Sequence, residues 1–269
     1  MKKKFPAVLI LLCLLMLTAP VSVQAAPYRY YRSRLSGFDR RMYDALLKGW
    51  ASGRKAVSIT AKGTDSIHSE VLSCLINDNP RLYWIRGARV TVTRMKKGKY
   101  RITFSMRQNW KNAVRSRSRL KSRLKRTVRR LRKACRGKSA AEKAGIIHDY
   151  IIKNCAYGDS KYDQTVYGVL LKKKAVCAGY ARTYKLLCDE LGVTCICVGG
   201  TVNGVNHLLN YVRIRGKWYY VDTTWDDTGS PGPVSRRFFL LGSADSGCHI
   251  TRYLRVSLPV LSAASLDAG

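Results

Sequence analysis

Apolar and polar residues follow first a helical and then a strand periodicity in the N-terminal part of the chain. Apolar positions recur at spacings of three and four across 38–50, which predicts an amphipathic helix with Asp39 near its start as a cap. A second helix is predicted over 65–75 on the same grounds. Apolar and polar residues alternate across 90–106 on either side of Lys97-Gly98, as in a half-buried β-hairpin. This part is therefore expected to be a small α+β region without catalytic residues.

The next segment combines helical periodicity with a high density of positive charge. Lys and Arg make up 13 of the 26 residues from Lys111 to Arg136, and no acid is present. The apolar residues of this segment keep a helical spacing: Leu120, Leu124, Val128, Leu131 and Cys135. We predict a basic amphipathic helix over 111–137. Its charges form either an ordinary solvated face or an anion-binding surface, because cations this dense repel one another unless an anionic partner compensates them.

Helical patterns return in the C-terminal half. Ser139 and Glu142 have the spacing of a capping box, which marks a helix start. A later apolar pattern runs from Cys177 and ends before Gly192, a residue typical of helix ends. Cys177 is thus expected in the first turn of a helix, where backbone N–H groups lower the pKa of a thiol, and the lysines at 172–174 are expected to act in the same direction. A buried, unreactive thiol is the alternative for this cysteine considered alone.

Two strand patterns flank Arg215-Gly216 and predict a second hairpin over 206–225. If these two residues form the turn, Asp222 falls opposite Leu209. His207 is then the diagonal neighbour of Asp222 on the same face of the hairpin, within reach of its side chain. A three-residue loop or a β-bulge would reverse this parity.

Cys177, His207 and Asp222 supply the three roles of a nucleophile, a base and an orienting carboxylate. Alone, His207 could be a half-buried structural histidine and Asp222 a turn residue, but an acid within an apolar strand calls for a partner. Cys195 and Cys197 share one strand face, yet a metal site with His207 would lack a clear fourth ligand. We therefore predict a Cys-His-Asp catalytic triad and expect no metal and no cofactor.

Three blocks of sequence carry a resemblance to a known family. They are Ala-Val-Cys-Ala-Gly-Tyr-Ala at 175–181, Asn-His-Leu-Leu-Asn at 206–210 and Trp-Tyr-Tyr-Val-Asp-Thr-Thr-Trp-Asp-Asp at 218–227. On these blocks the chain resembles a bacterial member of the transglutaminase-like superfamily. The resemblance implies a papain-like α+β fold, in which a cysteine-bearing helix packs on an antiparallel sheet that carries the histidine and the aspartate. It also implies thioester chemistry on protein or peptide substrates, by a peptidase or a transamidase.

The resemblance also bears on the roles of two further residues. Tyr167 is a candidate for an oxyanion-hole or gating residue, because a tyrosine commonly precedes the cysteine block in similar sequences, and core packing is its other possible role. Leu209 stands where such proteins usually have an aromatic residue, so the sequence leaves open what shields the site. The remaining histidines, His148 and His249, are expected to have surface or structural roles.

The N-terminus has the pattern of an exported protein. Three lysines precede an apolar run at 8–17, and Val23-Gln24-Ala25 is typical of a signal-peptidase site. An uncleaved membrane anchor is the alternative, but the run is shorter than the ~20 residues that span a bilayer. Export would permit disulfides among the cysteines that remain. The net charge of +34 implies an anionic partner or surface.

The expected organisation has four parts: a signal peptide at 1–25, an N-terminal α+β accessory region at 26–110, the basic helix at 111–137 and a transglutaminase-like catalytic domain at 138–269. We expect a secreted or cell-wall-associated cysteine enzyme that acts on amide bonds and binds an anionic cell-wall polymer or anionic lipid through 111–136. The alternative is a secreted wall-binding or polyanion-binding protein that keeps the fold without catalysis. Nucleic acid is not an expected partner, because the chain carries an export signal.

Overall fold

The computed structural model describes residues 27–62, 70–85, 87–106, 110–202, 204–229, 233–245, 251–252 and 256–267. Three expectations fall outside these residues: the signal peptide, the start of the helix predicted at 65–75, and the role of His249.

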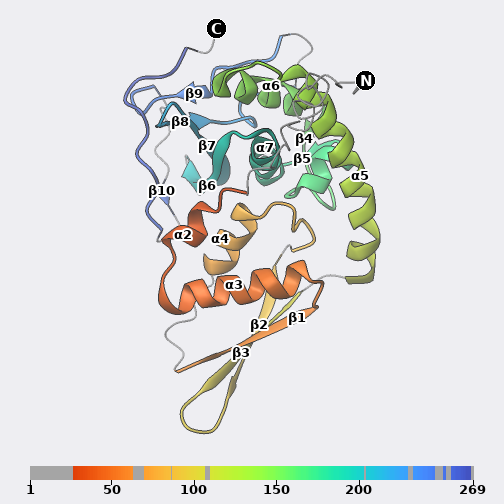
Figure 1. Cartoon of the computed structure of the whole chain (residues 1–269), viewed down its shortest axis with the longest axis vertical. Coiled ribbons are helices and arrows are strands. Elements are labelled where there is room, and N and C mark those ends of the chain that lie inside the picture. Colours follow the sequence, from red (N-terminus) through yellow and green to blue (C-terminus); the bar gives the residue numbers. More distant parts are fainter. Residues whose placement is uncertain are drawn as a thin grey trace, which may run out of the picture.

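Helices and two larger sheets make up the described structure (Figure 1). The helices are α2 (Tyr30–Arg34), α3 (Gly37–Ala51), α4 (Glu70–Asp78), α5 (Trp110–Ala134), α6 (Ala140–Ile152), α7 (Cys177–Leu191) and the π-helical turn η1 (Gly168–Lys172). The strands are β1 (Ala56–Ala61), β2 (Ala88–Arg94), β3 (Tyr100–Met106), β4 (Ala156–Tyr157), β5 (Lys174–Ala175), β6 (Thr194–Val202), β7 (Val205–Ile214), β8 (Lys217–Val221), β9 (Phe239–Leu241) and β10 (Thr251–Arg252).

Strand pairing places these elements in three sheets. Antiparallel pairs build a three-stranded sheet in the order β1-β3-β2 and a five-stranded sheet in the order β10-β6-β7-β8-β9. The short strands β4 and β5 form a parallel pair. The described chain is thus an α+β protein, as the sequence predicted.

The three-stranded sheet lies at one end of the molecule under α3 (Figure 1). The predicted hairpin is β2 and β3, but β2 is an edge strand that is exposed on both faces, with Val90 at 41% and Val92 at 43% exposure. The prediction of a half-buried hairpin was therefore wrong for β2. It holds for β3, the central strand, because β1 pairs with its other edge and Ile102 and Phe104 enter the core. The sequence patterns gave no indication of β1.

The helix predicted over 38–50 is α3, with one difference at its start. Ser36 is the N-cap residue, and Asp39 lies inside the first turn instead of capping it. The carboxylate still stabilises this end, since the first N–H groups of a helix carry a partial positive charge.

The five-stranded sheet packs against α7, which lies between this sheet and α5 in Figure 1. Helix α7 contacts β6 and β7 on one side, and α5 and α6 pack against it from others. The N-terminal region is tied to the same sheet, because the buried Tyr31 hydroxyl donates a hydrogen bond of 2.5 Å to the Cys197 carbonyl of β6. Helix α7 is thus enclosed between the sheet and the helices α5 and α6.

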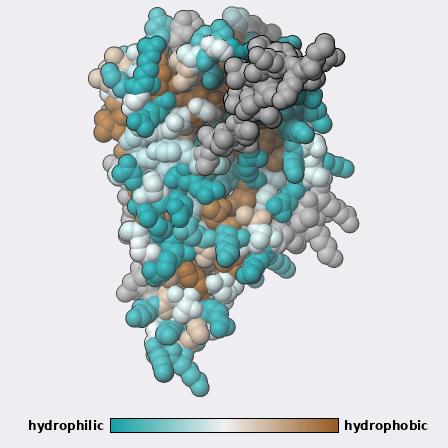
Figure 2. Space-filling model, in the orientation of Figure 1, coloured by the Kyte–Doolittle hydropathy of each residue, from teal (hydrophilic) through white to brown (hydrophobic). Residues whose placement is uncertain are grey.

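The predicted basic helix is present as α5, and its predicted apolar stripe is buried. The five apolar residues that defined the stripe are between 3% and 6% exposed, and they pack toward α7, α6 and η1. Hydrophilic side chains cover much of the molecular face in Figure 2, in keeping with the charge of the chain. None of the helices in the described residues has the length and apolar composition needed to cross a membrane.

The seven cysteines in the described part of the chain are all unpaired, and six of them are buried. Cys248 lies outside the described residues. The exception to burial is Cys177, which is half-buried. It is therefore the described thiol that is accessible for chemistry.

Candidate functional site

Helix α7 begins at Cys177, as the sequence predicted, and the fold at this point requires small residues. A Cβ on Gly179 would lie 2.2 Å from the Asp163 carbonyl oxygen and 2.7 Å from the Ala175 Cβ. Glycine therefore lets the first turn of α7 approach the preceding segment closely. The helix ends at Gly192 in the left-handed conformation, with a φ of 74°.

The hairpin of β7 and β8 has the predicted two-residue turn. Arg215 and Gly216 both have positive φ angles, 49° and 83°, which is typical of a type I′ turn. Ile214 pairs with Lys217, so the register that places His207 diagonal to Asp222 is confirmed. Asp222 follows the last residue of β8.

A network of donors fixes the Asp222 carboxylate against His207. The His207 Nε2 atom lies 2.6 Å from Asp222 Oδ2, and the Tyr220 hydroxyl donates to the same oxygen at 3.1 Å. The other oxygen accepts the backbone N–H groups of Thr224 at 3.0 Å and Trp225 at 3.2 Å. Asp222 is 1% exposed, so this carboxylate orients the imidazole from a position shielded from water.

The Cys177 thiol is the second partner of His207. Burial would raise the pKa of the thiol, but hydrogen bonding and charge interaction with His207, together with the N–H groups of Leu208 and Ala178, lower it overall. Burial likewise lowers the pKa of His207, and its interactions with Asp222 and Cys177 outweigh that effect and raise it to about 9. Since Nε2 faces Asp222, Nδ1 is the ring nitrogen left for the thiol. These opposite shifts favour the thiolate and imidazolium forms of the pair over the two neutral forms.

The neighbouring lysines, which were predicted to lower the pKa of Cys177, are not among the main causes of its shift. The pKa of Cys177 responds to His207 and to backbone N–H groups, whereas Lys173 acts on the buried Cys155. The reason is geometric: Lys173 adopts a left-handed conformation after η1, and Lys174 lies against Gly158.

A cavity of about 480 Å³ opens over the Cys177 thiol and His207. The ring of Trp225 stacks on His207 with centroids 5.3 Å apart and an interplanar angle of 27°. Trp225 therefore shields His207 in place of the aromatic residue that Leu209 replaces. Leu209 itself is buried, with 2% exposure. Tyr157 and Asp227 also line the cavity. No pattern in the sequence singled out these two residues or gave Trp225 this role.

Tyr157 reaches the site through the short pair of β4 and β5. It pairs with Ala175, two residues before Cys177. Partial burial and the nearby Cys177 raise the pKa of its hydroxyl. Asp227 is held by the buried Tyr180, whose hydroxyl donates to it.

Three other residues with candidate roles in the sequence lie outside this site. Tyr167 does not line the cavity; its ring stacks on Tyr83 with centroids 5.3 Å apart, so core packing is its role. His148 is fully buried and contacts Asp226 at 3.0 Å, which makes it structural. Cys197 is buried with a raised pKa, and no group of metal-binding side chains occurs among the described residues.

The paired ionisation predicts a specific pH profile. The His207 imidazolium should persist through neutral pH and be lost as pH rises through about 9, so amide turnover should fall on that alkaline limb. Alkylation of Cys177 by iodoacetamide needs only the thiolate and should already be fast below the ordinary cysteine pKa of about 8.5. Asp222→Asn should shift the alkaline limb to lower pH, because Asp222 helps to raise the His207 pKa.

Both rates should be measured across a pH series at constant ionic strength, with the alkylated residue located by mass spectrometry. Alkylation that rises in a single step near about 8.5, as for a free thiol, would contradict the ion pair. An alkaline limb that stays in place in Asp222→Asn would contradict the assigned cause.

A thiol, an imidazole and a carboxylate thus lie next to one another on an α+β scaffold, which is the arrangement of a cysteine enzyme. The comparison with protein families points to the same kind of protein. Residues 125–223 match the model of the transglutaminase-like superfamily. Over that segment, which begins inside α5 and contains Cys177, His207 and Asp222, the chain is similar to this superfamily.

Similarity to individual proteins is more limited. Kyphoscoliosis peptidase of Mus musculus is 32% identical over 69 residues, which is 21% of this chain and 10% of that protein. The Homo sapiens protein of the same name is 29% identical over 85 residues, or 27% of this chain and 13% of that protein. This chain thus matches only a small part of their length. A crystal structure of a TGase is 17% identical with a TM-score of 0.36, over 66% of this chain and 53% of that chain.

Proposed function

We propose that the chain is an exported cysteine enzyme that acts on amide bonds of protein or peptide substrates through Cys177, His207 and Asp222. The observation that carries the proposal is the position of His207, which lines the same cavity as Cys177 and interacts with its thiol, while its Nε2 atom lies 2.6 Å from Asp222 Oδ2. A structural histidine would need neither a half-buried thiol nor an open cavity beside it. The N-terminal pattern supports export.

The chemistry follows from the ion pair. The Cys177 thiolate attacks the amide carbonyl carbon, the C–N bond breaks, and the His207 imidazolium gives its proton to the leaving nitrogen. The acyl group is left on sulfur as a thioester. Water or an amine then attacks the thioester, His207 takes the proton of that nucleophile, and the thiolate is released. Asp222 holds the ring and stabilises its charged form throughout.

Hydrolysis and acyl transfer share this thioester and differ in the nucleophile that resolves it. A peptidase would attack a backbone amide and use water, whereas a transamidase would attack a glutamine carboxamide, release ammonia and use a lysine amine. The proposal covers both, because the triad performs the same steps in each.

The proposal is tested by labelling the full chain with an electrophilic amide analogue that forms a stable bond to sulfur. We expect one adduct, located at Cys177 by mass spectrometry, and none in Cys177→Ala. Glutamine-containing peptides should then be assayed for ammonia and for new N-termini. Ammonia release with added amine indicates a transamidase, and new N-termini indicate a peptidase. Labelling that persists in Cys177→Ala would refute the nucleophile.

A second part of the proposal concerns the partner of the basic segment. We propose that 111–136 binds an anionic cell-wall polymer or an anionic lipid. Support comes from the exposed cations of α5, which surround a cavity separate from the one at Cys177. The superfamily match concerns the fold and gives no support to this part.

A further inference from the structure

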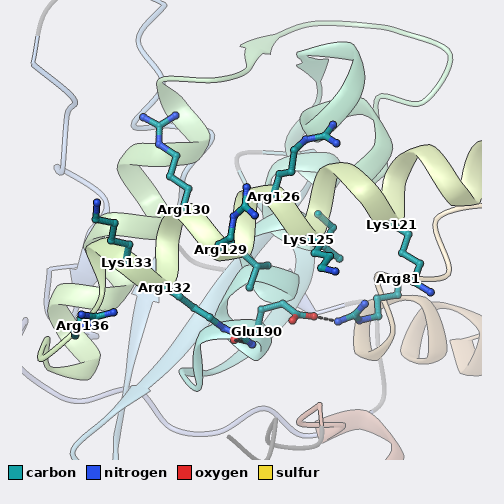
Figure 3. Close-up of a pocket in the computed structure, with 12 residues that line it drawn as sticks. Arg81, Lys121, Lys125, Arg126, Arg129, Arg130, Arg132, Lys133, Arg136 and Glu190 are labelled. Carbon is teal, nitrogen blue, oxygen red and sulfur yellow. Dashed lines mark hydrogen bonds and ion pairs between the residues drawn. The ribbon is translucent and has the colours of Figure 1, made fainter.

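A second cavity, of about 880 Å³, lies between α5 and two residues from other elements, Arg81 and Glu190 (Figure 3). Nine Lys or Arg side chains line it, against the single acid Glu190. Leu124 and Val128 supply an apolar floor. Cationic walls over a partly apolar floor suit an extended anionic molecule.

Five of the cations form a row along one side of α5 and the turn that follows it, because each directly follows a residue of the buried stripe. The five are Lys121, Lys125, Arg129, Arg132 and Arg136. Their spacing of three or four residues keeps them on one side of the helix. At about 1.5 Å of rise per residue the four members on the helix span about 16 Å, with a cation every ~6 Å. Figure 3 shows Lys121 and Arg132 on the side of Arg81 and Glu190, and Arg126 and Arg130 on the other side.

The row is largely uncompensated within the protein. Glu190 pairs with Arg81, and Arg132 donates to the Glu190 backbone carbonyl at 3.3 Å. The side chains of the other four members make no hydrogen bond or ion pair among the residues that the structure describes. Like charges held this close raise the free energy of the folded chain unless an anion binds between them.

We propose that the groove binds a single strand of a non-nucleic polyphosphodiester, of which poly(glycerol phosphate) is the simplest example. A straight row of cations with regular spacing matches a linear chain that carries one permanent negative charge per unit. The guanidinium groups of Arg129 and Arg136 can each contact two phosphate oxygens. This inference deepens the anionic-partner part of the proposed function and rests on that part alone.

The shape and lining of the groove disfavour other polyanions. Single-stranded nucleic acid is usually held by aromatic side chains that stack on its bases, and the residues lining this cavity include none. A flat bilayer would meet an outward-facing surface, whereas Lys121 and Arg132 face a second wall that carries Arg81 and Glu190. A polymer strand can enter such a groove.

The groove is separate from the Cys177 cavity. Glu190 is thirteen residues beyond Cys177 on α7, a rise of about 20 Å along the helix. A bound strand would therefore hold the enzyme on a polyanionic matrix and leave the cavity at Cys177 open to substrate.

The test measures binding of the full chain to poly(glycerol phosphate) as a function of salt. The row variant Lys121→Gln, Lys125→Gln, Arg129→Gln and Arg136→Gln should bind at least about tenfold more weakly in 0.1 M salt. The slope of log affinity against log salt should fall by about 3, at roughly 0.7 per cation removed. All four positions are exposed, and their removal relieves charge repulsion, so without polymer the variant should melt at the temperature of the parent or above it.

A matched control separates the row from total charge. The control variant also removes two lysines and two arginines, but from exposed positions around the β2–β3 hairpin: Arg89→Gln, Arg94→Gln, Lys96→Gln and Lys99→Gln. It should bind polymer like the parent. Equal losses in the two variants would show nonspecific charge attraction and overturn the groove. Equal or tighter binding of single-stranded DNA, or binding of anionic phospholipid vesicles without binding of the polymer, would overturn the ligand class.

Failure of this inference is distinguishable from failure of the catalytic proposal. The row variant should still be labelled at Cys177 by the electrophilic amide analogue, and Cys177→Ala should still bind polymer. Loss of labelling in the parent chain leaves the groove intact, and loss of polymer binding leaves the triad intact.

Discussion

Cys177→Ala and His207→Ala are each expected to abolish turnover of amide substrates. Without the thiol no thioester can form, and without the imidazole the thiol loses the interaction that lowers its pKa and the leaving nitrogen loses its proton donor. Single removal of the nucleophile or the base in a serine-protease triad lowers kcat about 10⁶-fold. Losses of that order should take turnover below detection in both variants.

The measurement compares turnover and covalent labelling in the parent and the two variants, with thermal melts to show that each remains folded. Cys74→Ala is the matched control, because it removes a thiol that is 1% exposed and whose pKa burial raises to about 12. This control should be less stable but fully active. Full turnover in Cys177→Ala would refute the enzyme proposal.

Asp222→Asn is expected to leave a folded protein with turnover reduced by about 10² to 10⁴, the upper figure being that of the corresponding change in a serine protease. The Asn oxygen can keep the backbone N–H groups of Thr224 and Trp225. Its NH₂ group would then face His207 Nε2 and the Tyr220 hydroxyl, which now point at Asp222 Oδ2. Nε2 would have to accept a hydrogen bond, so the ring proton would move to Nδ1 and the imidazolium would lose its stabilising charge.

The loss should be smaller than for a serine nucleophile, because the N–H groups of Ala178 and Leu208 continue to lower the pKa of the Cys177 thiol. Turnover and iodoacetamide alkylation should be measured together, and we expect alkylation to decline much less than turnover. Asp149→Asn makes the same chemical change beside His148, at 3.1 Å from its ring, and should leave turnover within a few-fold of the parent. Equal turnover in Asp222→Asn and the parent would remove the orienting role.

The local parts of the site could be predicted from the order of residues along the chain. Spacing of apolar residues placed Cys177 at the start of a helix, since an α-helix exposes one face every three or four residues. The Arg215-Gly216 turn fixed the register of its hairpin, because side chains alternate strictly between the two faces of a strand. The capping box at Ser139 and Glu142 and the buried stripe of α5 were readable for the same reason. These features depend on residues close together in the chain.

The distant residues that complete the site and the groove became known only from the packing of the elements. Trp225 covers His207, the two-residue strand β4 brings Tyr157 beside Cys177, and Glu190 meets Arg81 opposite α5. Tyr167 joined an aromatic cluster instead of the site. Such contacts join side chains from elements far apart in the chain, and no periodicity specifies which elements pack together. The packing of α7 between the sheet and α5 selects them, because it sets which surfaces face one another.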